Sequence, residues 1–465
     1  MAQAVSGGSL FVVQMARGRS LRLLSVASAS LLTWVVTRWS ADVLSFATSP
    51  SAVHLAESSQ LQTSSFRPTD GETAWTSTGR DGSGAFSIAG MAMVAGVALA
   101  ATNRRKPVRS LAASSRVQVS ATAGHIDCLA IVGASGAVGQ EMLNCVEKRD
   151  FPTNKVRLFA KRSAGETVKT KFGDVVVEPF SVEAVQECEV ALLAVSGDFS
   201  KEFSPLIRGG SKGTVVVDNS SAWRYDKDVP LIVPEINGSA GEGSNLLSNP
   251  NCTTAIGAMT LWPLHQKYKL KKVIMSTYQA ASGAGAEGMK ELEEGLVAYA
   301  TGGAVPTPEV FAHQLPFNVI PQIDAFQENG YTKEEMKVTW ELEKIFSLDE
   351  DVKVSCTAVR VPTLRAHSES ITIETELPID PAGAREVLEH ADGVVVVDDT
   401  SSMLYPMPLN VTGEDDVEVG RIRQSIVFGD HGLDFFLSGD QLLRGAALNA
   451  VIIAEQKVKE RFGSA

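Results

Sequence analysis

The pattern of hydrophobic and polar positions is regular from residue 123 onward, where short apolar runs alternate with segments of helical periodicity. The first run, Ile126–Val132, ends at a glycine-rich turn and has the length and continuous apolar character of a buried parallel strand. Similar runs at residues 190–196 and 214–221 also alternate with helical segments. This alternation predicts an α/β fold built on a doubly wound parallel sheet.

The glycine-rich turn after the first predicted strand reads Gly-Ala-Ser-Gly-Ala-Val-Gly at residues 133–139. Glycine lacks the Cβ atom that would keep the backbone away from a pyrophosphate, and the helix that follows directs free NH groups at the negative charge. The spacing is GxxGxxG instead of the more usual GxGxxG, and a turn without any ligand is the alternative. We predict the dinucleotide site of a Rossmann-type domain, formed by Gly133, Ser135, Gly136, Ala137, Val138 and Gly139.

The residues after the second predicted strand indicate which dinucleotide binds. An enzyme that selects NAD places an acidic residue at this point, on the ribose diol. This chain has Lys161, Arg162 and Ser163 instead. Cations and a hydroxyl suit a 2′-phosphate, so we predict NADP(H) as the cofactor, with Arg162 and Ser163 at that phosphate.

The five cysteines lack CxxC and Cys/His ligand spacing, so neither a disulfide framework nor a metal site is predicted. Cys252 differs from the other four because it stands at the start of an apolar helical pattern. A helix N-terminus stabilises a thiolate, and we expect it to lower the pKa of this thiol. Cys252 is therefore the candidate nucleophile, and the others fit buried structural positions.

Four motifs carry a resemblance to one family: Pro-Asn-Cys-Thr-Thr at residues 250–254, Tyr-Gln-Ala-Ala-Ser-Gly-Ala-Gly at 278–285, Arg-Val-Pro at 360–362 and Ala-His-Ser-Glu at 366–369. In wording, order and spacing these motifs resemble the aspartate-semialdehyde dehydrogenases. The resemblance extends from about Ile126 to the C-terminus.

The resemblance implies NADPH-dependent reductive dephosphorylation of L-aspartyl 4-phosphate to L-aspartate 4-semialdehyde and phosphate, a step in lysine, threonine and methionine biosynthesis. Cys252 matches the residue that forms the thioacyl intermediate, and Gln279 matches the residue that orients the acyl group. His367 matches the acid/base, a role that suits imidazole because its ordinary pKa lies near working pH.

The resemblance also assigns the charged groups that hold the substrate. Arg224 and Lys344 with Asn251 match the phosphate ligands, and Arg360 matches the ligand of the α-carboxylate. Bidentate arginine is well shaped for both anions. Glu341 matches the partner of the substrate ammonium.

Two further segments match cofactor contacts. Ser282 and Gly283 match a second turn against the cofactor, and Gln441 stands in a late stretch that returns to the nicotinamide. The family usually has asparagine at the position of Gln441 and serine at that of Thr253. We expect these two departures to affect the geometry of cofactor binding and not the chemistry.

The matched segments imply a discontinuous nucleotide domain. We predict a Rossmann-type NADP-binding domain at residues 123–254 and 430–465, and an α+β catalytic and dimerisation domain at residues 255–429. The β-rich segments of the second domain suit a sheet that packs against its twin, so a homodimer or homotetramer is expected.

The first 122 residues differ from the rest of the chain. Residues 1–120 hold 11 Lys and Arg against 5 Asp and Glu, although the whole chain has a net charge of −12. Arginines precede an uncharged stretch at residues 23–37, and a second uncharged run at residues 82–103 ends at a basic cluster. This order indicates a targeting leader that is removed, and a membrane anchor is the alternative.

The leader resembles the bipartite leaders of plastid proteins in algae with secondary plastids, because a Ser/Thr-rich spacer separates its two apolar elements. We therefore expect the plastid stroma as the location, with the mitochondrion as the alternative. We expect no stable membrane contact after processing. The acidic body of the chain argues against nucleic-acid binding.

Two other functions compete with this interpretation. An N-acetylglutamyl-phosphate reductase would share the architecture but would need no partner for a free ammonium, so Glu341 discriminates against it. A non-catalytic NADPH-binding redox sensor could use Cys252 as a switch. A sensor would not need Gln279, Arg360 and His367 beside that cysteine.

Overall fold

The computed structural model describes residues 124–463. The targeting leader predicted at residues 1–122 lies outside these residues. Within the described part, no helix has the length and apolar character needed to cross a membrane. The same part contains no group of three or more His, Cys, Asp or Glu side chains placed to bind a metal ion.

The first sheet has five parallel strands in the order β2-β1-β5-β6-β7. Their bounds are β1 Ile126–Val132, β2 Thr153–Phe159, β5 Val190–Leu193, β6 Val215–Asp218 and β7 Leu246–Ser248. The order places β1 in the interior of the sheet, with helical connections between strands, as in a doubly wound fold. The predicted parallel sheet is therefore confirmed.

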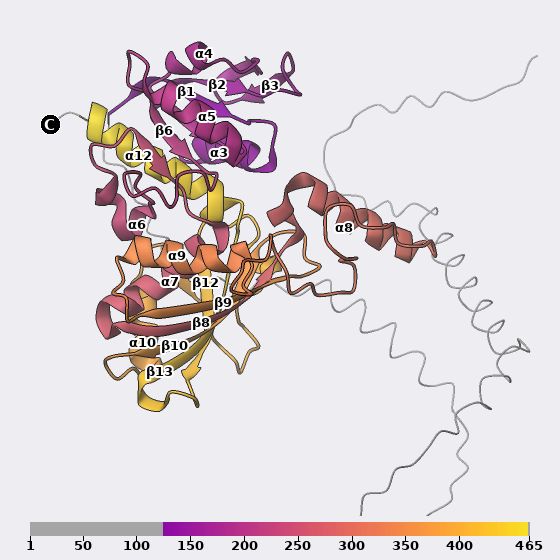
Figure 1. Ribbon diagram of the computed structural model, residues 1–465, viewed down its shortest axis with the longest axis vertical. Coiled ribbons are helices and arrows are strands. Elements are labelled where there is room, and N and C mark those ends of the chain that lie inside the picture. Colours follow the sequence, from indigo (N-terminus) through magenta and orange to yellow (C-terminus); the bar gives the residue numbers. More distant parts are fainter. Residues whose placement is uncertain (1–123, 464–465) are drawn as a thin grey trace, which may run out of the picture. The chain divides into compact units, whose positions relative to one another are not determined.

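Strand β1 is apolar throughout because both of its faces are covered. Leu129 and Ile131 pack into a core with the helices on one side, whereas Ala130 and Val132 pack into a second core on the other side. The helices around this sheet are α3 Ala137–Lys148, α4 Val182–Gln186, α5 Gly197–Arg208 and α12 Leu448–Phe462. Figure 1 shows α12, from the far end of the chain, beside this sheet. A small hairpin is formed by β3 Thr167–Thr170 and β4 Gly173–Val176.

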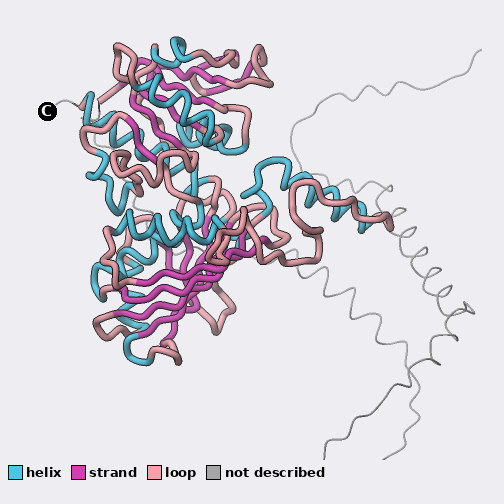
Figure 2. The backbone as a smooth tube through the Cα atoms, viewed as in Figure 1, coloured by secondary structure: helices cyan, strands magenta, loops and turns pink. Residues whose placement is uncertain are grey.

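The second sheet has six strands of mixed direction in the order β11-β12-β13-β10-β8-β9. Their bounds are β8 Leu270–Gln279, β9 Lys353–Arg360, β10 His367–Thr375, β11 Val394–Val396, β12 Val417–Gln424 and β13 Gly432–Gly439. Three helices pack their apolar residues against one face: α7 Cys252–Tyr268, α9 Lys333–Phe346 and α10 Pro381–Glu389. Figure 2 shows this sheet as a broad band of strands with helices along one side.

Shorter elements join the larger ones. The remaining helices are α6 Pro234–Asn237, α8 Gly285–Ala300 and α11 Pro408–Val411, and single turns lie at η4 Gly238–Gly241, η5 Ala281–Ala284, η6 Gly429–His431 and η7 Leu443–Ala447. Helix α8 and the loop after it form a small apolar cluster of their own, which includes Leu292 and Leu315.

The predicted boundary at residue 430 is wrong by about ten residues. Strand β13 pairs with β10 and β12 in the six-stranded sheet, so it belongs to the second domain. The chain returns to the first core only at Leu443 and continues there through α12. The pattern of residues 432–439 gave no signal for this choice, because a buried strand is equally apolar in either sheet.

The core under the six-stranded sheet contains one unusual carboxyl group, that of Glu369 on β10. The residue is 0% exposed, and among the described residues neither carboxyl oxygen has a hydrogen-bond partner. The side chain faces helix α7, where a Cβ atom on Gly257 would come within 2.6 Å of Oε2. Burial raises the pKa of Glu369 well above its ordinary value of 4.5, so the group is neutral in the folded protein near that pH.

Glu369→Gln is expected to flatten the dependence of folding stability on pH. A raised folded pKa contributes stability that is fully present below the unfolded value of 4.5 and is lost as pH rises through the folded value. Between pH 4.5 and the folded pKa, the free energy of unfolding of the variant minus that of the parent should therefore grow by about 1.4 kcal/mol per pH unit. Urea denaturation at several pH values measures it, and parallel curves would contradict the neutral carboxyl.

Candidate active site

Three strand ends meet at one edge of the six-stranded sheet. Gln279 ends β8 and Arg360 ends β9, and the two residues are direct partners because these strands are parallel. His367 begins β10, which runs antiparallel to β8. The three side chains, predicted from separate motifs, are therefore brought together.

Cys252 is the first residue of α7, as predicted. The side chain of Asn251 caps this helix, because its Oδ1 accepts hydrogen bonds from the backbone NH groups of Thr253 at 3.0 Å and Thr254 at 3.3 Å. Gly445 lies against the cysteine, and a Cβ atom on it would be 2.8 Å from the Cys252 Cβ. Residues from both domains thus enclose the nucleophile.

The expectation of a lowered thiol pKa is wrong. Loss of solvent and then the charge of Glu334 raise the pKa of Cys252 to about 12, although Arg224 and Arg360 act in the opposite direction. Cys252 remains partly exposed as a residue. The helix N-terminus favours the thiolate, but burial outweighs it here.

The ring of His367 is fixed by one hydrogen bond. The backbone NH of Ala280 donates to Nδ1 at 3.0 Å, so in the neutral ring the proton lies on Nε2. Nε2 is buried and has no partner among the described residues. Burial and then Arg360 lower the pKa of His367 to about 3. The neutral ring therefore presents an unpaired donor, and it could accept a proton at Nε2 only if the Ala280 bond broke.

Arg360 lies beside His367 under the turn that contains Gly283. Its Nη1 donates to the carbonyl oxygen of Ala280 at 2.6 Å, and its side chain is buried. A Cβ atom on Gly283 would come within 2.6 Å of that Nη1 and 3.4 Å of the His367 ring. A side chain at this position would therefore displace the guanidinium of Arg360.

Arg224 and Glu341 form a buried ion pair. Nη1 of Arg224 lies 3.1 Å from Oε1 of Glu341, which also accepts from the Tyr225 hydroxyl at 3.3 Å. Oε2 of Glu341 accepts from the backbone NH of Asn251 at 2.6 Å. With 0% exposure and both oxygens occupied, Glu341 anchors Arg224 and Asn251 in this state. Its predicted contact with an ammonium stays a prediction.

Lys344 holds the loop that carries Arg224. Its Nζ donates to the carbonyl oxygens of Arg224 at 2.9 Å, Asp226 at 2.6 Å and Val229 at 2.8 Å. These bonds use all three donors of the ammonium. Lys344 therefore positions Arg224 in this state, and its own contact with phosphate would require one of these bonds to break.

Sequence reasoning missed Glu334, on the first turn of α9. Its Oε1 accepts from the side-chain amides of Asn251 at 2.9 Å and Gln279 at 3.2 Å. Glu334 belongs to the run Thr332-Lys333-Glu334-Glu335, in which Thr332 and Glu335 form a capping box. The capping box is visible in the sequence and marks the start of a helix. It gives Glu335 a capping role and leaves Glu334 without one.

The predicted dinucleotide turn has the geometry that a pyrophosphate needs. Gly133 has φ of +85°, and a Cβ atom on it would lie 2.2 Å from the Ala194 carbonyl oxygen. A Cβ atom on Gly139 would meet the Gly133 carbonyl oxygen at 2.2 Å. Ser135 and Gly136 complete the turn, and α3 begins at Ala137 with its first NH groups, which include that of Val138, free of helical partners. The residues present therefore fit a dinucleotide.

The residues predicted at the 2′-phosphate are available to a ligand. Lys161 and Arg162 are exposed and form no ion pair within residues 124–463. The hydroxyl of Ser163 is buried and lacks a partner in the same range. An unpaired hydroxyl that directly follows two exposed cations in the sequence fits a phosphate better than it fits the diol of NAD.

Ser282 and Gln441 are bound to each other. The side-chain amide of Gln441 donates to the Ser282 hydroxyl, and its Oε1 accepts from the backbone NH of Ala366 at 2.7 Å. Ala366 has φ of +70° and precedes His367. Gln441 therefore supports the turn at Ser282 and the start of β10, and its contact with nicotinamide stays a prediction.

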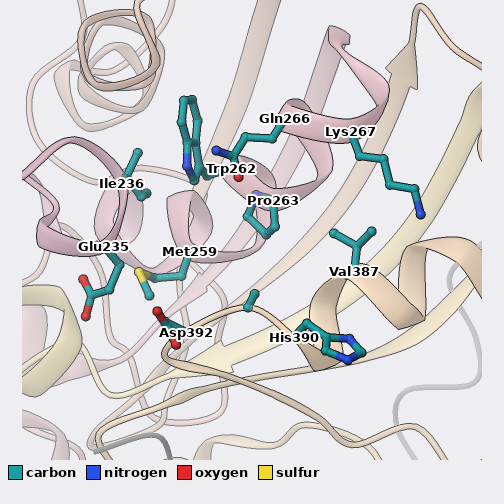
Figure 3. Close-up of a pocket in the computed structure, with 11 residues that line it drawn as sticks. Glu235, Ile236, Met259, Trp262, Pro263, Gln266, Lys267, Val387, His390 and Asp392 are labelled. Atoms are coloured by element: carbon teal, nitrogen blue, oxygen red, sulfur yellow. The ribbon is translucent and has the colours of Figure 1, made fainter. Parts of the chain in front are cut away.

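A cavity of about 610 Å³ lies elsewhere, between α6, α7 and α10 (Figure 3). Glu235, Trp262 and His390 are among the residues that line it. None of the residues discussed above as site candidates contributes to its wall. The cavity is therefore separate from the cluster around Cys252.

Comparison with protein families gives two matches. The model described as "Semialdehyde dehydrogenase, NAD binding domain" matches residues 129–243. The model described as "Semialdehyde dehydrogenase, dimerisation domain" matches residues 261–444. Together they cover the second sheet and all of the first sheet except β7 and the start of β1, and the second match ends after β13, in agreement with the corrected boundary.

Individual proteins match over the same region. Aspartate-semialdehyde dehydrogenase of Aquifex aeolicus is 44% identical over 337 residues, which are 71% of this chain and 98% of that protein. The enzyme of Prochlorococcus marinus is 44% identical over 329 residues, 70% of this chain and 94% of that protein.

Solved structures give the same picture. Aspartate semialdehyde dehydrogenase II of Vibrio cholerae complexed with ASA is 37% identical, with a TM-score of 0.68, and the match covers 72% of this chain and 99% of that one. The enzyme with NADP from Candida albicans, 22% identical with a TM-score of 0.56 over 72% of this chain and 99% of that one, is similar in fold.

Proposed function

This chain belongs to the aspartate-semialdehyde dehydrogenase family, and on that premise we propose that Cys252, Gln279, Arg360 and His367 form its active site. The reaction is the NADPH-dependent reductive dephosphorylation of L-aspartyl 4-phosphate to L-aspartate 4-semialdehyde and phosphate. It serves the biosynthesis of lysine, threonine and methionine. The observation that carries the residue assignment is that three strand ends meet at one edge, where Glu334 accepts hydrogen bonds both from Gln279 at the end of β8 and from Asn251 at the start of α7.

The first half of the reaction is acyl transfer to Cys252. Its sulfur attacks the carbonyl carbon of the acyl phosphate, the C–S bond forms, and the C–O bond to phosphate breaks with its electron pair. Phosphate carries away the proton that the thiol gives up. Arg224 and Asn251 are the groups that we assign to the phosphate, since Glu341 holds both of them in place.

The second half is reduction of the thioester. NADP(H) is the cofactor, and when bound it supplies the hydride. The unpaired Nε2–H of His367 is oriented to stabilise the oxygen that becomes negative as the carbon is reduced. Collapse of that oxyanion breaks the C–S bond, releases the aldehyde and leaves the thiolate of Cys252, which takes up a proton from solvent.

Arg360→Lys is expected to raise the KM for the substrate about 10- to 100-fold, the effect of losing one charged hydrogen bond. One Nη of Arg360 is already held by the Ala280 carbonyl, and a single ammonium cannot keep that bond and also clamp a carboxylate. Steady-state kinetics with L-aspartate semialdehyde measures the change. Arg208→Lys, an exposed arginine on α5, is the matched control. An unchanged KM would remove Arg360 from the substrate site.

The protein forms a dimer through its dimerisation domain. We propose the face of the six-stranded sheet that α7, α9 and α10 do not cover as the contact. Ile274 is 50% exposed and Tyr278 is 40% exposed on that face, and Tyr278 packs against Phe436. The pairing of two dimers into a tetramer is a further proposal, which sedimentation velocity would test.

We also propose that residues 1–122 direct the protein to a plastid. The support is the order of cations, apolar runs and Ser/Thr-rich spacer in the sequence. Residues 1–122 fused to a fluorescent protein should reach the plastid in an alga with secondary plastids. Arrival in the mitochondrion or retention in a membrane would contradict the proposal.

The activity is tested with protein begun near Ala123. NADP⁺ reduction with L-aspartate semialdehyde and phosphate is followed by absorbance. Turnover supports the assignment. Activity only with the N-acetylglutamyl substrate, or NADPH binding without any turnover, would favour the reductase of that substrate or the redox sensor, neither of which family membership favours.

A further inference from the structure

Arg365 is a charged side chain that no step described so far uses. It is the only charged residue in the loop 361–366, which connects β9 to β10 and ends directly before His367. Its Nε donates to Oδ2 of Asp440 at 2.7 Å, and its Nη1 donates to Oε1 of Glu141 at 2.6 Å. Glu141 lies on α3 in the first domain. One guanidinium therefore joins the two domains beside the candidate acid/base.

Asp440 gives this arginine a fixed attachment point. Its side chain is 0% exposed, and Oδ1 accepts from the backbone NH groups of Leu442 at 3.0 Å and Leu443 at 3.3 Å. Oδ2 accepts from the backbone NH of Gly413 at 2.7 Å as well as from Arg365. The carboxylate cannot turn without leaving buried polar groups unpaired, so it defines where the Nε of Arg365 lies.

The same contacts hold an unusual backbone turn before His367. Strands β10 and β13 pair up to His367, and beyond this point side chains continue the contact. Asp440 binds Arg365, and Oε1 of Gln441 accepts from the backbone NH of Ala366 at 2.7 Å. Ala366 has φ of +70°, a conformation that residues other than glycine rarely keep unless their surroundings hold them in it. The contacts of Arg365 and Ala366 therefore determine the direction in which His367 enters the site.

The second carboxylate connects this turn to the predicted cofactor helix. Glu141 lies one turn into α3, and the free NH groups at the start of that helix are those predicted to bind the pyrophosphate. The side chains of Arg365 and Glu141 are 23% and 17% exposed, so water reaches their ion pair only in part. The pair is a direct contact between the cofactor helix and the loop that carries His367.

We propose that Arg365 is a positioning residue for the reduction step: by binding Glu141 and Asp440 together, it sets where His367 lies relative to a cofactor on α3. The inference rests on the proposed function of this site. Arg365 does not itself touch the reacting atoms. His367 acts on the oxygen of the thioester while hydride reaches the adjacent carbon, and a misplacement of about 1 Å between such groups lowers a rate by about 100-fold.

The test uses Glu141→Gln and Arg365→Gln, alone and combined. Glu141→Gln weakens the contact with α3 but leaves the bond to Asp440, so it should lower kcat about 3- to 10-fold. Arg365→Gln loses both charged bonds and should lower kcat about 10- to 100-fold. Because the two residues act through one contact, the combined variant should be no slower than Arg365→Gln. The Kd for NADPH, measured by fluorescence titration, should stay within about threefold of the parent, since neither residue belongs to the glycine turn.

A second comparison separates the positioning of His367 from a general structural role. In a His367→Ala background, Glu141→Gln should change kcat by less than about twofold, because the group that the contact positions is gone. A contact that only stabilised the fold would slow the enzyme equally in both backgrounds.

Lys148→Gln is the matched control. Lys148 lies on the last turn of α3 and also binds the second domain, through Asp415 at 2.9 Å, but at the end of the helix opposite to the dinucleotide turn. This variant should keep the kcat of the parent. Thermal unfolding checks that each variant is folded, and Glu141→Gln carries the test if Arg365→Gln is not.

Three results would overturn the inference: an unchanged kcat in Glu141→Gln, an equal loss in Lys148→Gln, or an equal loss from Glu141→Gln in the His367→Ala background. Each of these requires an active parent, so each leaves the proposed function standing. A parent without turnover would instead overturn the proposed function, and with it the inference that rests on it.

Discussion

Cys252→Ala is expected to abolish turnover, by at least about 10⁴-fold, because no other nucleophile can form the thioester. The side chain is the first of α7 and lies against Gly445, and its truncation removes one sulfur atom without adding a polar group to the site. Its loss therefore leaves the fold intact. NADPH should bind as tightly as to the parent, since the glycine turn at Gly133 and the cations near Arg162 belong to other segments.

The measurement is paired: turnover by absorbance and NADPH affinity by fluorescence titration. Cys188→Ala, which removes a buried thiol from the core beside β5, is the control and should keep its activity. Loss of NADPH binding in Cys252→Ala would mean that the cysteine belongs to the cofactor site. Residual turnover above about 1% of the parent would mean that the sulfur is not the nucleophile.

His367→Ala is expected to lower kcat by about 10²- to 10⁴-fold, the range for loss of a positioned acid or donor. His367→Gln should retain part of the rate, because its amide can present an NH where Nε2–H lies. The backbone NH groups of Ala281 and Ser282 in the adjoining turn donate to carbonyl oxygens of the 360–367 loop at 2.8 and 3.0 Å, bonds that do not involve His367, so neither variant should alter NADPH binding. Equal rates in the two variants would show that the donor at Nε2 does not contribute.

The pH profile gives a second check on His367. With a pKa lowered to about 3, the ring of the free protein is neutral throughout pH 5 to 9. Protonation would occur only as pH falls toward that value, so kcat/KM should show no step near 6.5 that His367→Gln removes. A step at 6.5 present in the parent and absent in the variant would contradict the buried, neutral ring.

The sequence predicted the sheet of the first domain because its strands are covered on both faces and are therefore continuously apolar, as at β1. It also predicted that Cys252 begins a helix, because the break before it and the apolar pattern after it are local signals. The gathering of Gln279, Arg360 and His367 came from the family resemblance. No local sequence pattern indicates that these three strands end at the same edge of the six-stranded sheet.

The other features of the site, which are the thiol pKa and the partners of Glu341 and Lys344, depend on contacts between distant segments. Local sequence does not encode such contacts. The thiol pKa is set by burial and by Glu334, which lies 82 residues along the chain. The carboxylate of Glu341 and the ammonium of Lys344 are occupied by backbone and side-chain groups of distant segments. A charged residue on a helix gives the same sequence pattern whether its side chain binds a ligand or another residue.

The most direct test of the central claim omits phosphate. The protein is mixed with L-aspartate semialdehyde and NADP⁺, so that oxidation can proceed to the thioester of Cys252 but no further. The account predicts a burst of NADPH equal to the number of sites, together with a mass increase of one aspartyl group on the peptide that contains Cys252. Steady turnover without phosphate, or the acyl group on another residue, would contradict it.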